Sequence, residues 1–123
     1  DDRIVQRFAL AVFYHAMGGA NIAGLNRWLE SSTECGWGGG AIELRCNEQN
    51  LVDLIGGRGL SGVVPIELAL LTSLGHLDLY KNAISGSIPH EVGLLSALTH
   101  LSLADNHLEG PIPSELWGLT RLV

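Results

Sequence analysis

The sequence predicts an α/β solenoid. Its coils would carry a short parallel sheet on the concave side and 3₁₀ or short helical segments on the convex side, behind a helical N-terminal cap. One 24-residue pattern occurs twice in succession, beginning at Leu74 and at Leu98. Leucines recur within each copy at alternating positions, as in a strand with one buried face. The first 50 residues do not follow the pattern, which is typical of a segment that covers the apolar end of a stack.

The two copies share the spacing L-x-x-L-x-L-x-x-N-x-L, followed by a glycine and an Ile-Pro pair. A period of roughly 20–29 residues with this spacing is the leucine-rich repeat signature. A further copy begins at Leu122. We therefore divide the chain into a cap at 1–50, which includes the Cys35–Cys46 loop, and about three repeats at 51–123, truncated in the next.

The first repeat is irregular. A step of 24 back from Leu77 reaches Asp53, which is unsuited to an inward position. We predict that Val52 and Leu54 are the inward pair, and that a bulge near Ile55–Gly56 absorbs the slip of one residue. Without the bulge, one strand would expose its apolar face to water.

Asn82 and Asn106 follow the two regular strands, where the chain bends and leaves backbone groups unpaired. An asparagine side chain has two donors and an acceptor, so we predict a structural ladder that satisfies these groups. Arg58 takes this place in the first repeat and lacks an acceptor.

The cap begins with a predicted helix over 2–17. Its expected buried stripe recurs at three- and four-residue steps. A short helical turn over 21–29 with Trp28, and a strand over 41–46, are expected to follow. The residues of the stripe are Ile4, Val5, Phe8, Ala11, Val12 and His15.

Cys35 and Cys46 lie close together in a glycine-rich segment. We interpret them as a disulfide, which would contribute roughly 2–3 kcal/mol by restricting the unfolded chain. The alternative is a pair of reduced thiols in a cytosolic protein. A metal site is disfavoured because no histidine or second cysteine pair lies nearby at ligand spacing.

Composition and motifs exclude several classes of function. A formal charge of −6 argues against nucleic acid and anionic membranes as partners. No apolar stretch approaches the ~18 residues of a membrane span. The G-x-G-x-x-G string at 57–62 is explained by the repeat, because the mechanism of that motif requires a helix directly after it. No catalytic triad is recognisable, so we predict neither an enzyme nor a cofactor.

The repeat pattern, a cap with Trp28, and the Cys35/Cys46 pair together resemble the plant-type leucine-rich repeat proteins, which include the ectodomains of receptor-like kinases and receptor-like proteins. The opening segment 8–19 is similar to the cap of algal relatives. The resemblance implies a curved solenoid, a second short strand at each G-x-I-P step, and recognition of proteins or peptides outside the cell or at its surface. The cysteines are eleven apart, wider than usual in the family, and no Asn-x-Ser/Thr site is present.

The outward strand positions form the predicted ligand-binding surface. His76 and His100 should lie side by side on neighbouring strands, as a ligand-binding or pH-sensing pair, as a metal site completed by Asp78, or as a solvated ladder that duplication of the repeat produced. We favour the solvated ladder and predict no metal site. Tyr80 is the best single contact residue, since exposed aromatic side chains are typical of binding surfaces. The predicted surface comprises His76, Asp78, Tyr80, Lys81, His100, Ser102 and Asp105.

These observations predict a non-catalytic module that binds a protein or peptide ligand through its concave face. The alternative is a structural or assembly subunit that docks other chains through its convex side and its C-terminal edge. Trp117 and the Leu122–Val123 edge would then make the contacts.

Overall fold

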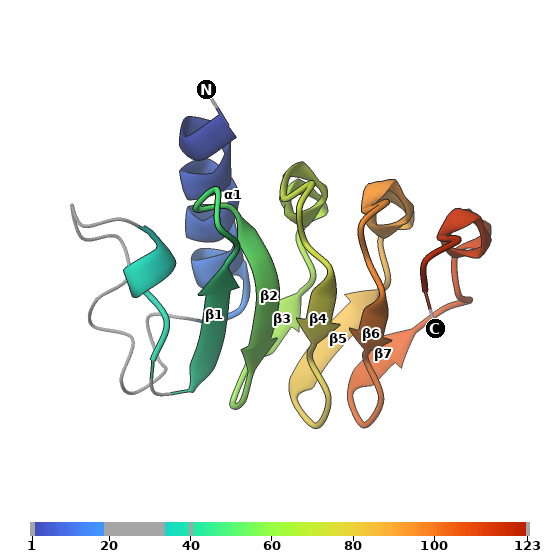
Figure 1. Cartoon of the computed structure of the whole chain (residues 1–123). Helices are drawn as coiled ribbons and strands as arrows, with labels where there is room; N and C mark the ends of the chain where they lie inside the picture. Colours follow the sequence, from blue (N-terminus) through green and yellow to red (C-terminus); the bar gives the residue numbers. More distant parts are fainter. Residues whose placement is uncertain (1, 19–33, 40, 123) are drawn as a thin grey trace.

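The structure, a computed structural model, describes residues 2–18, 34–39 and 41–122. Helix α1 stands at one end, and the coils follow it in a row (Figure 1). Trp28, the helical turn expected over 21–29, and Val123 lie outside the described residues. The elements are α1 Asp2–Ala16, the 3₁₀ turn η2 Glu34–Gly36, β1 Ile42–Cys46, β2 Val52–Gly57, β3 Ser61–Val63, η3 Ile66–Leu70, β4 His76–Asp78, β5 Ala83–Ser87, η4 His90–Leu94, β6 His100–Ser102, β7 His107–Glu109 and η5 Ser114–Gly118.

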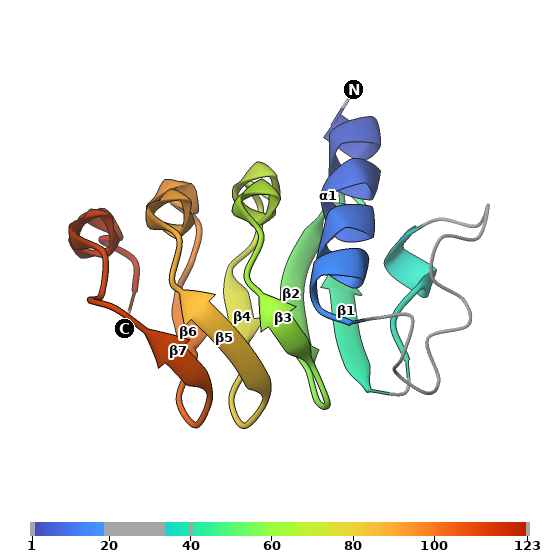
Figure 2. The same ribbon diagram turned by 180° about the vertical axis from the view of Figure 1, so that it is seen from behind.

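The strands form two sheets, one on each side of the row of coils. The first sheet has the order β1-β2-β4-β6, in which β2, β4 and β6 are parallel and β1 pairs antiparallel with β2. The second sheet, β3-β5-β7, is parallel and is best seen from behind (Figure 2). A 3₁₀ turn follows each strand of the second sheet. The predicted solenoid with a short parallel sheet and 3₁₀ turns is confirmed.

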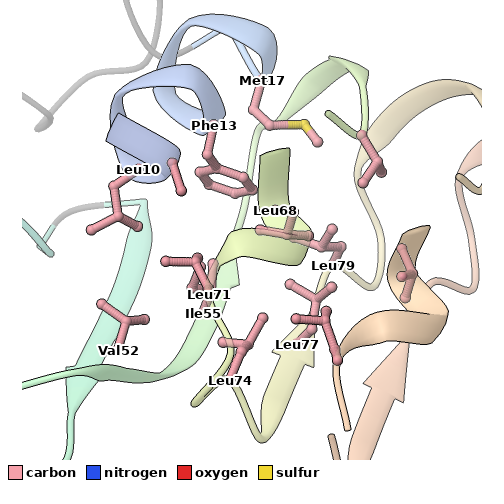
Figure 3. Packing of buried hydrophobic residues seen from close by; sticks show 14 of the residues in the cluster. Leu10, Phe13, Met17, Val52, Ile55, Leu68, Leu71, Leu74, Leu77 and Leu79 are labelled. Atoms are coloured by element: carbon pink, nitrogen blue, oxygen red, sulfur yellow. The ribbon is translucent and has the colours of Figure 1, made fainter. Parts of the chain in front are cut away.

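The core runs along the inside of the coils and continues beneath α1 (Figure 3). Leu77 of β4 pairs in register with Leu101 of β6, and Leu77 is fully buried. Leu10 and Phe13 of α1, and Met17 directly after it, extend the same cluster over the first coil. Fully burying a side chain of this size contributes roughly 1.5–3 kcal/mol, so this seam is the main contact holding α1 in place.

The predicted helix forms, but the predicted buried stripe is wrong. Ile4 and Phe8 are 70% and 55% exposed, whereas Phe13 and Met17 are fully buried. The helix has apolar residues on two faces, and tertiary contacts choose between them. Gln6 belongs to the chosen face, and its Oε1 accepts a hydrogen bond from the backbone N–H at the start of β2, which an apolar side chain cannot do.

The predicted register of the first repeat is also wrong. Ile55 pairs with Leu77 and Leu54 pairs with His76, so the inward residues are Val52 and Ile55, while Leu54 faces outward. The irregularity lies where β2 pairs with Arg45 and Cys46 of β1, and not at Ile55–Gly56. Ile55 precedes its partner Leu77 by 77 − 55 = 22 residues, two fewer than the 24-residue period, so β2 is shifted by two residues relative to the regular repeat.

A disulfide joins Cys35 to Cys46, with their Cα atoms 5.7 Å apart. It ties η2 to β1 and resolves the choice between a disulfide and two thiols. Trp37 beside it is buried, and the Arg7 guanidinium lies 4.7 Å from the centre of its ring. The segment 34–39 is therefore fastened to both α1 and β1.

A buried polar cluster also joins α1, η2 and β2. The Nε2 atom of Gln6 donates to Glu34 Oε1 at 2.9 Å, and its Oε1 accepts from the Val52 N–H at 2.6 Å. Arg3 and Arg7 lie 3.6 and 3.4 Å from the Glu34 carboxylate. Burial would raise the pKa of Glu34, but the hydrogen bonds and the two arginines outweigh it, so the pKa lies below its ordinary value.

Replacing Glu34 is expected to change how stability depends on pH. Because folding lowers the pKa of Glu34, its charge stabilises the fold above the unfolded-state pKa, and this contribution disappears as pH falls through the folded-state pKa. We expect Glu34→Gln to cost about 1–3 kcal/mol at pH 7, the value of a hydrogen bond to a charged group. Urea unfolding of both proteins at pH 7 and pH 3 measures this. A difference between the proteins that is equal at both pH values would contradict the prediction.

Candidate ligand-binding surface

The outward side chains of the β1-β2-β4-β6 sheet lie in rows, because alternate residues of a strand face the same side. We call this surface the front face, after its position in Figure 1. The pairing register defines the rows. One row contains Arg45, Leu54, His76 and His100, and the next contains Glu43, Gly56, Asp78 and Ser102.

The two histidine rings stack on one another. Their centroids are 4.1 Å apart and their planes differ by 18°. The Thr99 hydroxyl donates its single proton to the Gly75 carbonyl, at 3.0 Å, and lies 2.8 Å from His100 Nδ1. Among the described residues, no group of three or more metal-ligating side chains is present.

The residues at the strand exits lie in a tight turn. Asp78 Oδ1 accepts from the Tyr80 N–H at 3.2 Å, and the Lys81 ammonium lies 5.2 Å from the centre of the Tyr80 ring. Lys81 and Asp105 have the same left-handed backbone conformation, with φ of 55°. Asp105 thus takes in the next coil the place that Lys81 has in this one, and Ser102 lies beside Asp78 in register.

Asn82 and Asn106 fix the position of these turns. Asn82 Oδ1 accepts from the Leu60 N–H at 2.9 Å, and its Nδ2 donates to the carbonyls of Gly57 and Leu79 at 3.0 and 2.9 Å. Asn106 makes the equivalent hydrogen bonds one coil later. Each side chain therefore joins its own turn to the preceding one, so the front face is held by a rigid frame.

An open groove of about 710 Å³ lies on the front face, where β1, β2 and β4 meet. This volume is in the range of small-ligand sites, roughly 300–1,000 Å³. Sequence reasoning missed the part contributed by β1 and β2, because it did not predict their antiparallel pairing. The alternation of apolar and polar residues along 41–46 was the available signal for this pairing. The groove is lined by Ala41, Glu43, Gly56, Gly57, Arg58, Asp78, Tyr80 and Lys81.

The residues of the predicted ligand-binding surface therefore fall into two groups. Asp78, Tyr80 and Lys81 line the groove. His76 and His100 form the stacked pair beside it.

The residues of the alternative surface lie apart from the groove. Trp117, on η5, is 75% exposed. Leu122 is partly buried and packs against the core. Within the part of the chain that the structure describes, no helix is both long and apolar enough to cross a membrane.

Comparison with known proteins gives matches to one family model and to many solved structures with a similar fold. Residues 73–95 and 97–119 match the Leucine Rich Repeat family model. No curated protein sequence matches the chain.

Three of the similar solved structures, each matched over 95% of this chain, illustrate the likeness. The PEPR1–AtPEP1 complex has a TM-score of 0.83 at 27% identity. The ectodomain of the Arabidopsis thaliana membrane receptor kinase GASSHO1/SCHENGEN3, in complex with CASPARIAN STRIP INTEGRITY FACTOR 2, has a TM-score of 0.79 at 28% identity. The Arabidopsis receptor kinase HAESA, in complex with the peptide hormone IDA and the co-receptor SERK1, gives the same two values. This chain covers 17%, 14% and 20% of those chains, respectively.

Proposed function

We propose that this chain, a leucine-rich repeat protein that resembles plant receptor ectodomains, is a non-catalytic module that recognises a protein or peptide ligand through its front face. The groove beside the stacked histidines is the observation that carries the proposal. It is open, and its lining contains no serine, cysteine or histidine that would serve as a nucleophile or its base. The complexes of similar receptors, including HAESA with a peptide hormone, support a peptide as the ligand.

The front face suits recognition because it is ordered before any ligand arrives. The asparagine ladder fixes the turns that carry Tyr80 and Lys81. A surface that is already rigid loses less conformational entropy on binding, which leaves more of the contact energy as affinity. Tyr80 is 43% exposed and supplies an aromatic contact at the edge of the groove.

The disulfide supports a location outside the cell or at its surface, because such bonds persist in oxidising compartments and are rare in the cytosol. The receptor ectodomains to which the fold is similar support the same location.

Substitutions on the two surfaces test the proposal. Peptides are selected from a displayed random library on the wild-type protein, and the affinity of the best one is measured by calorimetry. We expect His76→Ala, Tyr80→Ala and His100→Ala together to weaken binding at least thirtyfold, since binding hot spots cost about 2 kcal/mol or more. Trp117→Ala is the control, and it should leave the affinity within twofold.

The opposite result would favour a second candidate, an assembly subunit that docks other chains through its convex side and its C-terminal edge. The exposure of Trp117 on η5 is the observation that favours this candidate. Binding that survives the triple substitution and is lost with Trp117→Ala would replace the first proposal with the second.

A further inference from the structure

We propose that the groove takes an extended peptide segment carrying a basic and an acidic residue two positions apart. The lysine or arginine side chain would lie between Glu43 and Asp78, and the acidic side chain would lie against Arg58 and Lys81. This inference rests on the proposed function and names the chemical class of its ligand.

The first support is the row that crosses the floor of the groove. Gly56 of β2 pairs with Glu43 of β1 on one side and with Asp78 of β4 on the other. A Cβ atom placed on Gly56 would lie 3.8 Å both from Glu43 Oε2 and from Asp78 Cβ. Gly56 is itself buried beneath its neighbours. The absence of a side chain at Gly56 therefore leaves the space between the two acidic residues on either side of it unfilled.

The second support is that neither carboxylate is held in a close ion pair. Within residues 2–18, 34–39 and 41–122, neither Glu43 nor Asp78 has an ion-pair partner within 4.0 Å. Arg45 faces the same side as Glu43, but its Nε donates to Asp53 at 2.9 Å. The formal charge of −6 on the whole chain also favours a ligand that carries a positive group.

The third support is the opposite charge at the end of the groove. Arg58 and Lys81 line it where β2 and β4 end, and both are exposed. A purely cationic ligand would meet repulsion there, so a ligand with both signs fits better. Arg58 lies two residues beyond Gly56, about 6.6 Å along an extended chain. A peptide lying along β2 matches both charges when its basic and acidic residues are two positions apart.

The experiment is a selection of displayed random heptapeptides on the immobilised protein, followed by affinity measurements on the best peptide made synthetically. We expect the selected peptides to carry a lysine or arginine two positions from an aspartate or glutamate. Gly56→Val should weaken that peptide at least tenfold, because the new side chain fills the space between Glu43 and Asp78. Gly118→Val is the matched control, since no atom lies within 4 Å of a Cβ placed there, and it should change nothing.

A second variant covers the case in which Gly56→Val folds poorly. Glu43→Gln combined with Asp78→Asn removes both charges, while the new amide keeps the oxygen that accepts from the Tyr80 N–H. We expect it to weaken the peptide at least tenfold and to reduce the salt dependence of binding. A library that yields no peptide, peptides without the charge pair, or full affinity in these variants would overturn the inference.

The two proposals fail separately. A selected peptide that is lost with His76→Ala and His100→Ala but is unaffected by Gly56→Val would refute this inference and keep the front face as the binding surface. A peptide that depends only on Trp117 would refute both.

Discussion

A Gly62→Ala variant is expected to lose about 3 kcal/mol of stability or more. Gly62 lies in β3 with φ of 89°, and an added Cβ would overlap the carbonyl oxygen of Ala16 at the end of α1. The adjacent Ser61 N–H donates to the Met17 carbonyl at 3.2 Å. The substitution would therefore strain the backbone and force α1 away from the first coil. Urea unfolding followed by far-UV circular dichroism measures the loss.

Gly110→Ala is the matched control for that experiment. Gly110 has the same place in its repeat and a φ of 76°, but its added Cβ would meet only Ser87 Cβ, at 3.7 Å. We expect a loss of about 1–2 kcal/mol, which is the cost of the left-handed conformation alone. The additional loss of stability in Gly62→Ala, beyond the loss in Gly110→Ala, measures how much the docking of α1 contributes at this contact. Equal losses in the two variants would show that α1 contributes little to stability at this contact.

The repeated part of the fold follows from the sequence because each coil solves the same packing problem. Leu77 and Leu101 occupy equal positions and pair in register, as their spacing predicts. Stacking makes homologous residues spatial neighbours, so one correctly placed leucine fixes the next. The same reasoning predicted that His76 and His100 would lie side by side, and their rings stack at 4.1 Å.

The elements outside the repeat could not be predicted in this way. Helix α1 has apolar residues on two faces, and the hydrogen bond from the Val52 N–H to Gln6 depends on a partner 46 residues away. Prediction of the groove depended on the register of β2. The bulge predicted near Ile55–Gly56 left the direction of Gly56 undefined, whereas the observed register places Gly56 outward beside Asp78. A slip of one residue exchanges the two faces of a strand, so the wrong register concealed the site.

An Asn82→Leu variant is expected to lose about 3 kcal/mol or more. The leucine would leave two backbone groups without these partners, the Leu60 N–H and the Gly57 carbonyl, while the Leu79 carbonyl would keep its hydrogen bond from Asn106. Each unsatisfied buried group costs roughly 1–3 kcal/mol, reduced where water reaches it. The turn carrying Tyr80 would also lose its frame, so we expect weaker peptide binding together with lower stability. Urea unfolding and calorimetry on the same samples measure both effects.

Lys81→Gly is the control for this experiment. It shows whether any substitution in the turn lowers stability, or only one that removes the asparagine hydrogen bonds. Lys81 has a φ of 55°, which glycine adopts without strain, and its own side chain makes no ladder hydrogen bond in the described chain. Relief of strain and the greater freedom of glycine in the unfolded state nearly cancel, so we expect stability within about 1 kcal/mol of wild type. If Asn82→Leu changed stability as little as Lys81→Gly, water would be making the hydrogen bonds that the Asn82 amide makes in the wild type. The turns would then owe their positions to the leucines beneath them, and the rigidity that we ascribe to the front face would need another source.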